Sequence, residues 1–389
     1  MLRRIARTIR AAKLLAEKPE EILLTSTAEQ QERYARILSA NADVYPLSIA
    51  PVTVVKTDEK GLIDLVSAWS GTRKSATLAK DLNLDDLISI EPSHPVHGTG
   101  RRTTNTNPPW NLSLIGQPQA REHTGGKGVS IAVLDTGIDY NHPEIEARFT
   151  SEKGIDIISG ETPMDRNGHG THVAGTVAGR NVGVANEATL YAVKVLSDYG
   201  SGTSGGVMRG IDWATNKEVD VINMSLGGGG YSSAFQLIIN AAHDKGVVIA
   251  AAAGNSGREE AHYPAAYEHV ISVAAVDQHK NRASFSTKHK TLDVSAPGVD
   301  IYSLKPGGGY ATYSGTSMAC PHVAGSVALI RAVTTNDAEA ALKRTAEERG
   351  DWIEYGAGLI RIDRAIGSER STTARTLSQA NNILRRYIL

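Results

Sequence analysis

Two patterns of apolar residues divide the chain. From about residue 110 onward, short runs of consecutive apolar residues alternate with amphipathic stretches. Consecutive apolar residues predict strands that are buried on both faces, and amphipathic stretches predict the helices that cover them. The alternation therefore predicts an α/β fold with a mostly parallel sheet covered by helices on both faces. The expected strands are 129–135, 188–196, 219–226, 246–255 and 270–276, and two of the expected helices are 206–217 and 232–245.

The first hundred residues carry a different pattern, with shorter elements and fewer apolar runs. Val52, Val54 and Val55 are β-branched residues typical of a strand, and Thr27 with Glu29 nearby is typical of a helix start. The pattern predicts a small α+β domain. Its expected elements are a strand at 21–26, a helix at 27–42, a strand at 47–56, a helix at 59–69 and a strand at 86–91.

A segment rich in Gly, Thr, Asn and Pro separates the two patterns. It lacks hydrophobic periodicity, so we expect an exposed linker, and the pair Arg101-Arg102 lies within it. Proteolysis is easiest in such a segment, so we expect a processing site there. The expected divisions are a helical extension at 1–20, the small domain at 21–97, the linker at 98–107, the main domain at 108–366 and a tail at 367–389.

Composition narrows the possible partners and the compartment. The 41 basic and 42 acidic residues leave a net charge of −1, which gives no electrostatic argument for a nucleic-acid partner. Cys320 is the single cysteine, so no intrachain disulfide forms. No run approaches the ~18 apolar residues of a transmembrane segment. The basic N-terminus has no uninterrupted apolar core of a secretory signal, so we expect a cytoplasmic protein as written, and a secreted one if a leader precedes it.

Two motifs place an acid and a base next to glycines. AVLDTGIDYNHPE puts Asp135 at the end of a predicted strand, where a helix-capping role is the alternative. NGHGTHVAGTVAG puts His169 between two glycines at the start of a predicted helix. A helix cap, or a metal site shared with His172, is the alternative there. No cysteine or carboxylate joins the two histidines at zinc-like spacing, so we expect no metal ligands.

A third motif, YSGTSMACPHVAG, places Ser317 where a Gly-Thr turn enters a helix. The hydroxyl then lies at the positive end of the helix dipole, although a capping serine would occupy the same position. A thiol pair of Cys320 with His322 is a further alternative, which we consider weaker because Cys320 is expected to face the helix interior as a small apolar residue.

An Asp, a His and a Ser in three such turns form a coherent catalytic set. Serine needs a base to become a nucleophile, and histidine titrates close to neutral pH. A carboxylate fixes the imidazole tautomer and stabilises the imidazolium. The order Asp, His, Ser along the chain is the order that general motif rules give for subtilisin.

The segments DTGID, HGTHVAGT and SGTSMACPHVAG resemble the three signature blocks of the subtilisin-like serine proteases, the subtilases, and the resemblance runs from about residue 108 to 366. It implies that Asp135 orients the base, that His169 is the base and that Ser317 is the nucleophile. The segment AAAGN at 251–255 resembles the oxyanion-hole segment of the family, which implies that the side chain of Asn255 donates to the oxyanion. The alternative for Asn255 is an ordinary turn residue.

The resemblance also implies where a substrate binds. SLGGGG at 225–230 resembles the strand that lines the primary specificity pocket, and 200–202 resembles the strand on the opposite side. An extended substrate would pair between them as an added strand, which favours protein and peptide substrates. The implied binding residues are Gly200, Ser201, Gly202, Ser225, Leu226, Gly227 and Gly228.

The N-terminal domain resembles the inhibitor-like propeptide of the family, and the segment 87–97 resembles its last strand. The resemblance implies a zymogen that processes itself, with the propeptide as an intramolecular inhibitor. A latent subtilase that serves as an interaction protein is one alternative, and an esterase with the same triad chemistry is another. The presence of the triad together with Asn255 argues against the first, and the peptide-binding strands argue against the second.

Catalysis of this kind requires no cofactor, and calcium is the one ion that the resemblance suggests. The family commonly carries a calcium-binding loop inserted in the helix that follows the catalytic histidine. The segment between Ala178 and Leu190 is too short for that loop and holds one carboxylate, Glu187. Glu144 would add one more from elsewhere, short of the six to eight oxygens that calcium takes. We therefore expect the usual high-affinity site to be absent.

Overall fold

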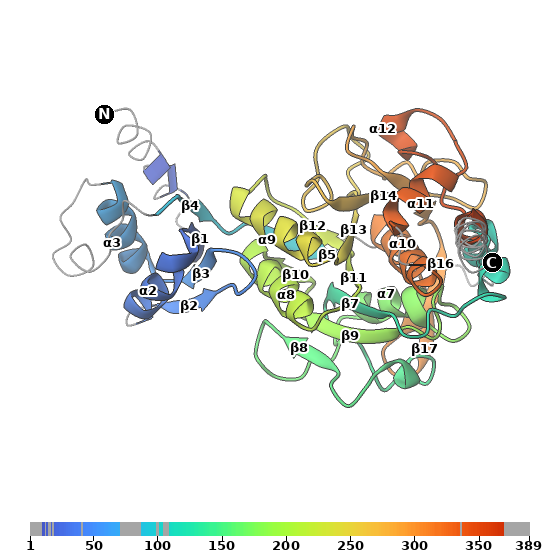
Figure 1. The fold of residues 1–389 in the computed structure, drawn as a ribbon, viewed down its shortest axis with the longest axis horizontal. Helices are drawn as coiled ribbons and strands as arrows, with labels where there is room; N and C mark the ends of the chain where they lie inside the picture. The colour runs from blue at the N-terminus through green and yellow to red at the C-terminus, as the bar shows by residue number, and fades with distance from the viewer. Residues whose placement is uncertain are drawn as a thin grey trace, which may run out of the picture.

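The computed structural model describes residues 10–11, 13–14, 17, 19–39, 42–70, 87–98, 101–103, 109–334 and 337–368. A small N-terminal unit lies beside a much larger one along the long axis of the molecule (Figure 1). The extension predicted at 1–20 and the tail predicted at 367–389 lie largely outside the described residues. None of the helices in the described ranges combines the length and the apolar character that crossing a membrane requires.

The large unit is built on a seven-stranded sheet whose strands all pair in parallel. The predicted α/β class is therefore confirmed, and each strand expected from its apolar run is present in this sheet. The strands in spatial order are β15 (Val294–Pro297), β14 (Val270–Val276), β13 (Val248–Ala252), β11 (Val221–Met224), β7 (Ser130–Asp135), β9 (Thr189–Lys194) and β8 (Gly154–Asp156).

Helices cover both faces of this sheet, which explains why its strands are mostly apolar. Successive side chains of a strand point to opposite faces. In β7, Ile131 and Val133 pack into the core on one face, and Ala132 and Leu134 pack into the core on the other. The first face is covered by α7 (His169–Ala178) and α10 (Thr316–Arg331), and the second by α8 (Ser204–Asn216) and α9 (Ser233–Asp244).

The small unit is an antiparallel four-stranded sheet with α2 and α3 on one face. In its first strand, Ile22 and Leu24 pack against those helices, whereas Leu23 joins the core that α8 and α9 form. The other face of the small sheet therefore rests on α8 and α9 (Figure 1). The elements are β1 (Glu21–Thr25), α2 (Ala28–Leu38), β2 (Asp43–Pro46), β3 (Val52–Lys56), α3 (Glu59–Ser70) and β4 (Ser89–Pro92).

Two short strands continue from the small unit across the large one, where the sequence predicted one strand and a linker. Strand β5 (Pro95–Gly98) pairs between β10 (Ser201–Thr203) and β12 (Leu226–Gly227), so the segment 87–97 is divided between two sheets. Strand β6 (Arg101–Thr103) pairs with β17 (Gly309–Ser314), so part of the expected linker 98–107 is a strand. Both strands owe their existence to partners roughly 100 to 210 residues away along the chain.

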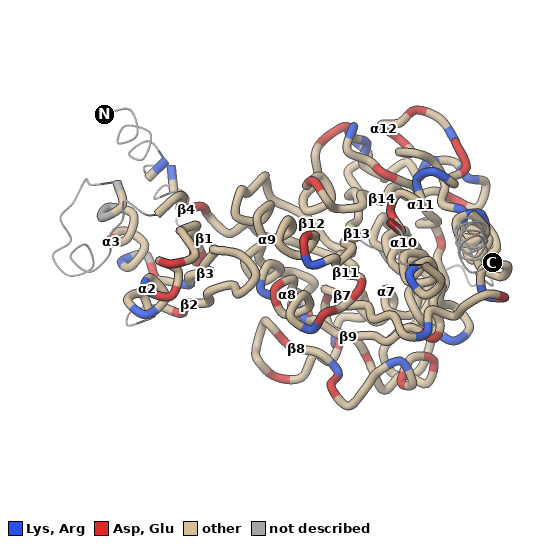
Figure 2. The backbone as a smooth tube through the Cα atoms, viewed as in Figure 1, with Lys and Arg blue, Asp and Glu red and all other residues tan. Residues whose placement is uncertain are grey.

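The remaining elements surround the large sheet. Strand β16 pairs with β17 in an antiparallel ribbon beside α7. Lys and Arg alternate with Asp and Glu along both units (Figure 2), in keeping with a net charge of −1. The elements that surround the large sheet are α5 (Trp110–Leu114), α6 (Gln117–Arg121), η2 (Glu146–Arg148), β16 (Ile301–Lys305), α11 (Ala338–Thr345) and α12 (Trp352–Tyr355).

Candidate active site

The carboxyl ends of the parallel strands bring the predicted site residues to one edge of the large sheet. Asp135 is the last residue of β7, and Asn255 follows β13 by three positions. His169 is the first residue of α7, and Ser317 is the second residue of α10. Functional groups in open α/β sheets gather at this edge because the loops that leave the strands meet there.

Asp135 and His169 are in direct contact. Nδ1–H of His169 donates to Oδ1 of Asp135 over 2.7 Å, and the backbone N–H of Thr136 donates to the same oxygen over 2.7 Å. A Cβ at Gly170 would collide with the carbonyl of Gly137 and crowd Asp135, so the glycine after the histidine is what allows this close approach. This hydrogen bond fixes the imidazole tautomer with Nε2 as the available acceptor.

Burial and charge act in opposite directions on the imidazole. Burial alone would lower the pKa of His169, but the charge and hydrogen bond of Asp135, together with the charge of Asp165, outweigh burial and raise that pKa. Nε2 of His169 is buried and has no hydrogen-bond partner among the described residues. The imidazole is thus held by its Nδ1 and presents an unengaged base at Nε2.

Ser317 lies on the opposite wall of the site. Its Oγ–H donates to the backbone carbonyl of Ser225 over 2.7 Å, and the Ser225 hydroxyl donates to the backbone carbonyl of Ser317 over 2.8 Å. The serine side chain is fully buried. In this arrangement the hydroxyl is directed at the carbonyl of Ser225, and the hydrogen bond to Nε2 of His169 that the triad hypothesis requires is not formed.

The side chain of Asn255 is anchored next to Ser317. Its Oδ1 accepts from the backbone N–H and from the hydroxyl of Thr316, each over 2.9 Å. Because the carbonyl end of the amide is committed to Thr316, the Nδ2 end retains its two donors. The amide is therefore oriented by the residue that precedes Ser317 in α10.

The two predicted binding strands lie on either side of the chain's own segment β5. Ser201 and Gly202 of β10 face His97 and Val96, and Leu226 of β12 faces Gly98. Gly98 donates its N–H to the carbonyl of Gly200 over 3.1 Å. Gly227 also pairs with His97, and a Cβ at Gly228 would lie 2.8 Å from the carbonyl of Pro95. The structure thus brings six of the seven predicted binding residues against β5, and the seventh, Ser225, directly precedes β12 and is hydrogen-bonded to Ser317.

A buried carboxylate that sequence reasoning missed supports both Asp135 and His169. Oδ1 of Asp165 accepts from the hydroxyl of Thr136 and from the backbone N–H of Gly168, each over 2.9 Å. Its Oδ2 accepts from the backbone N–H of Thr171 over 2.9 Å and from the hydroxyl of the same residue over 2.6 Å. The signal was an aspartate three positions before the residue that caps α7, where a carboxylate satisfies free backbone N–H groups.

The alternative site residues are engaged elsewhere. Nε2–H of His172 donates to the carbonyls of Ile301 and Ala311, and burial with the nearby His169 lowers the pKa of His172 to about 3. Burial lowers the pKa of His322 to about 4, while its Nδ1–H donates to the carbonyl of Met318. Within the described ranges there is no group of three or more His, Cys, Asp or Glu side chains placed to hold a metal ion.

The thiol alternative is inconsistent with this environment. Cys320 is fully buried, and burial raises the pKa of its thiol. Nε2 of His322, the histidine proposed as its base, accepts from the side-chain amide of Asn111 over 2.7 Å. A thiolate nucleophile needs a lowered pKa, and the pKa of Cys320 is raised.

Comparisons with known proteins agree with this geometry. The model of the family described as "Subtilase family" matches residues 126–371. The thermostable alkaline protease of Halalkalibacterium halodurans is 44% identical over 274 residues, which span 68% of this chain and 74% of that protein. Subtilisin E of Bacillus subtilis is 41% identical over 304 residues, spanning 74% of this chain and 77% of its own. The M-protease of Shouchella clausii is 36% identical over 367 residues, spanning 90% of this chain and 92% of its own. The chain therefore belongs to the subtilase family and is a subtilisin-like serine endopeptidase.

Proposed function

We propose that Oγ of Ser317 attacks the carbonyl carbon of the peptide bond while Nε2 of His169 takes the proton from the Ser317 hydroxyl. The contact between Asp135 and His169, with Nε2 left unengaged, is the observation that carries this assignment. The negative charge that develops on the carbonyl oxygen is stabilised by the side-chain amide of Asn255 and the backbone N–H of Ser317. The imidazolium then gives its proton to the leaving amine, and an acyl group remains on Ser317.

Water completes the reaction by the same groups in reverse roles. His169 takes a proton from water, the resulting hydroxide attacks the acyl carbon, and the proton returns to Oγ of Ser317. The Asp135 carboxylate stabilises the imidazolium in both halves of the cycle. The test is hydrolysis of casein by the purified protein, which we expect to be lost in Ser317→Ala. Casein hydrolysis by that variant at the wild-type rate would contradict the assignment.

The N-terminal unit acts, in this proposal, as an intramolecular inhibitor. Support comes from β5, which lies in the cleft as a substrate strand would. Further support comes from polar contacts at the ends of the two helices beneath the small sheet. Oε2 of Glu91 accepts from the hydroxyl of Ser232 over 2.8 Å and from the backbone N–H of Ser233 over 3.0 Å, at the start of α9. Asp212 of α8 accepts from the backbone N–H of Ser48 over 2.8 Å.

The two flanking strands support one cleavage position. Gly98 faces Leu226 in an antiparallel pair, and the residue before Leu226 is Ser225, whose carbonyl accepts from Oγ of Ser317. On the other side, Arg101 faces Ser314, three positions before the nucleophile. We therefore propose that the protein cleaves its own bond between residues 99 and 100, inside the predicted linker. Sequencing of the mature N-terminus should give Gly100, and an N-terminus between residues 45 and 92 would contradict the proposal.

The turn at which the family commonly binds calcium is, in our proposal, held without the ion. The chemistry itself requires no cofactor. Oε2 of Glu144 accepts from the backbone N–H of Asn181 over 2.8 Å, and Oε1 accepts from the side-chain amide of Asn181 over 2.6 Å. The backbone N–H of Arg180 also donates to the carbonyl of Glu144 over 3.1 Å. Donors of this kind satisfy a carboxylate that a cation would otherwise neutralise.

A further inference from the structure

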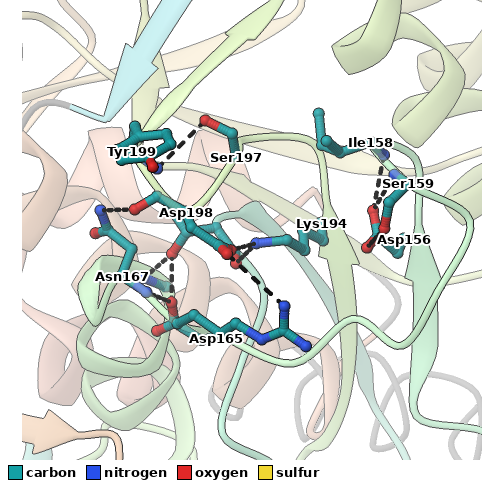
Figure 3. Close-up of polar contacts among 12 residues, drawn as sticks. Asp156, Ile158, Ser159, Asp165, Asn167, Lys194, Ser197, Asp198 and Tyr199 are labelled. Carbon is teal, nitrogen blue, oxygen red and sulfur yellow. Dashed lines mark hydrogen bonds and ion pairs between the residues drawn. The ribbon is translucent and has the colours of Figure 1, made fainter.

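Lys194 is a buried cation that the chemistry described above does not use. It is the last residue of β9, where it pairs with Asp135, and it is 5% exposed. Its Nζ donates to the carbonyl of Thr136 over 2.6 Å and to Oδ1 of Asp198 over 2.9 Å (Figure 3). A buried ammonium is costly unless its donors are paired, so these two contacts determine where the side chain lies.

Asp198 belongs to the tight turn that leads into the cleft strand β10. Within that turn, Gly200 donates its N–H to the carbonyl of Ser197 over 2.9 Å, and Ser197 donates its N–H to the carbonyl of Ser201 over 2.8 Å. Nη1 of Arg166 lies 3.9 Å from Oδ2 of Asp198, on the solvent side. The Asp198 side chain is 40% exposed, so Lys194 is its buried partner and Arg166 its exposed one.

Asn167 connects the same turn to the catalytic histidine. Its Oδ1 accepts from the backbone N–H of His169 over 3.2 Å, and its Nδ2 donates to the backbone carbonyl of Asp198 over 2.8 Å. Figure 3 shows Lys194 and Asn167 approaching Asp198 from two different segments. The turn is thereby attached through Lys194 to Thr136, the residue after Asp135. Through Asn167 it is attached to the backbone of His169 at the start of α7.

Nearby Asp156 does not compete for Lys194. Its Oδ1 accepts from the backbone N–H of Ile158 over 2.7 Å, and its Oδ2 accepts from the hydroxyl of Ser159 over 2.7 Å. The ammonium therefore has Asp198 as its carboxylate partner, although Asp156 pairs with Lys194 in the sheet.

We propose that Lys194, Asp198 and Asn167 are positioning residues. They hold strand β10 at a fixed position relative to Asp135 and His169. The carbonyl of Gly200, which closes the turn, accepts the N–H of Gly98 from the segment in the cleft. A peptide bound there is placed by Gly200, and Gly200 is placed by contacts that lead back to Asp135 and His169. The inference rests on the proposed function. It adds the reason that the scissile bond of a bound peptide lies next to Ser317.

A merely structural role would affect all substrates equally, whereas loss of register affects only substrates that pair with Gly200. The mature enzyme is therefore assayed with a blocked tetrapeptide anilide, long enough to reach Gly200, and with an N-acetyl amino-acid ester, which reaches the triad alone. The variants are Asp198→Asn, which keeps size and one acceptor oxygen, and Lys194→Met. The control is Glu152→Gln, which removes the charge from the exposed pair of Glu152 with Lys217.

For Asp198→Asn and Lys194→Met we expect kcat/KM on the tetrapeptide to fall by about tenfold or more, because small displacements of a reacting bond are costly. Ester hydrolysis should match that of the control variant, and so should the melting temperature of Asp198→Asn. Equal losses on both substrates, or no loss on either, would overturn the proposal. A wild-type enzyme that hydrolyses neither substrate in a Ser317-dependent way would instead show that the proposed function is wrong.

Discussion

The backbone of Gly98 lies against the imidazole of His169. A Cβ added at Gly98 would come within 3.3 Å of Nδ1 and 3.4 Å of Cε1 of that ring. The ring itself is held by Asp135 over 2.7 Å. The N-terminal segment therefore passes closest to the imidazole at a residue that has no side chain.

We predict that Gly98→Val slows maturation by about tenfold or more, because γ-methyl groups would displace the segment from an imidazole that its hydrogen bond holds in place. The rate at which full-length protein disappears, followed by mass spectrometry, measures this. Gly98→Ala is the matched control and should show a smaller effect. Once matured, both variants lack residue 98 and should have wild-type activity. Maturation of Gly98→Val at the wild-type rate would refute the proposed contact.

The pH profile should depend on Asp165. His169 acts as a base only when neutral, so activity falls as the pH drops through its pKa, which the Asp135 and Asp165 carboxylates raise above the ordinary 6.5 against the effect of burial. Removing one of these negative charges in Asp165→Asn should lower the pKa of His169. The acid limb of kcat/KM should then move to lower pH, while Glu152→Gln leaves it in place. An acid limb that stays where it is, or moves upward, would show that Asp165 does not act on the base.

Asn255→Ala should reduce kcat by about 10²–10³ and change KM little, because the amide meets a charge that exists only in the transition state. The magnitude is the one known for this donor in subtilisin, the system from which the general value is taken. Steady-state kinetics on a tetrapeptide anilide measures the effect. A large rise in KM at unchanged kcat would instead assign Asn255 to ground-state binding.

Stability should depend weakly on calcium, because Asn181 already satisfies both oxygens of Glu144. A ligand that binds only the folded state stabilises it in proportion to the logarithm of its concentration over Kd, and that contribution disappears without a site. The melting temperature of Ser317→Ala should therefore be nearly the same in millimolar calcium and in chelator. A shift of more than about 10 °C, well above the ~2–4 °C per kcal/mol expected at this size, would indicate a strong site.

The sequence predicted the large unit well because its signal is local. Nearly continuous apolar runs such as 129–135 and 270–276 are long enough to identify buried strands, and the turns around Asp135 and His169 carry their own glycines. The positions of Asp135 and Asn255 at strand ends follow from that pattern, and the structure places both at the same edge of the sheet.

The contacts that sequence reasoning missed depend on partners far along the chain. The residues of β5 and β6 carry no strand pattern of their own, and the family resemblance indicated one strand over 87–97. The pairing of β5 and β6 is supplied by β10, β12 and β17. Lys194 lies at the end of a strand, and its contacts depend on Thr136 and Asp198, which surround its ammonium. The orientation of Ser317 toward the carbonyl of Ser225 likewise depends on a residue from a distant segment of the chain.

The central claim, that this subtilase cleaves its own N-terminal unit with Ser317, is tested most directly by intact mass. Wild-type protein and Ser317→Ala are purified in parallel and incubated under the same conditions. The wild type should lose residues 1–99, and the variant should stay at full length. Maturation of Ser317→Ala, purified alone, at the rate of the wild type would contradict it.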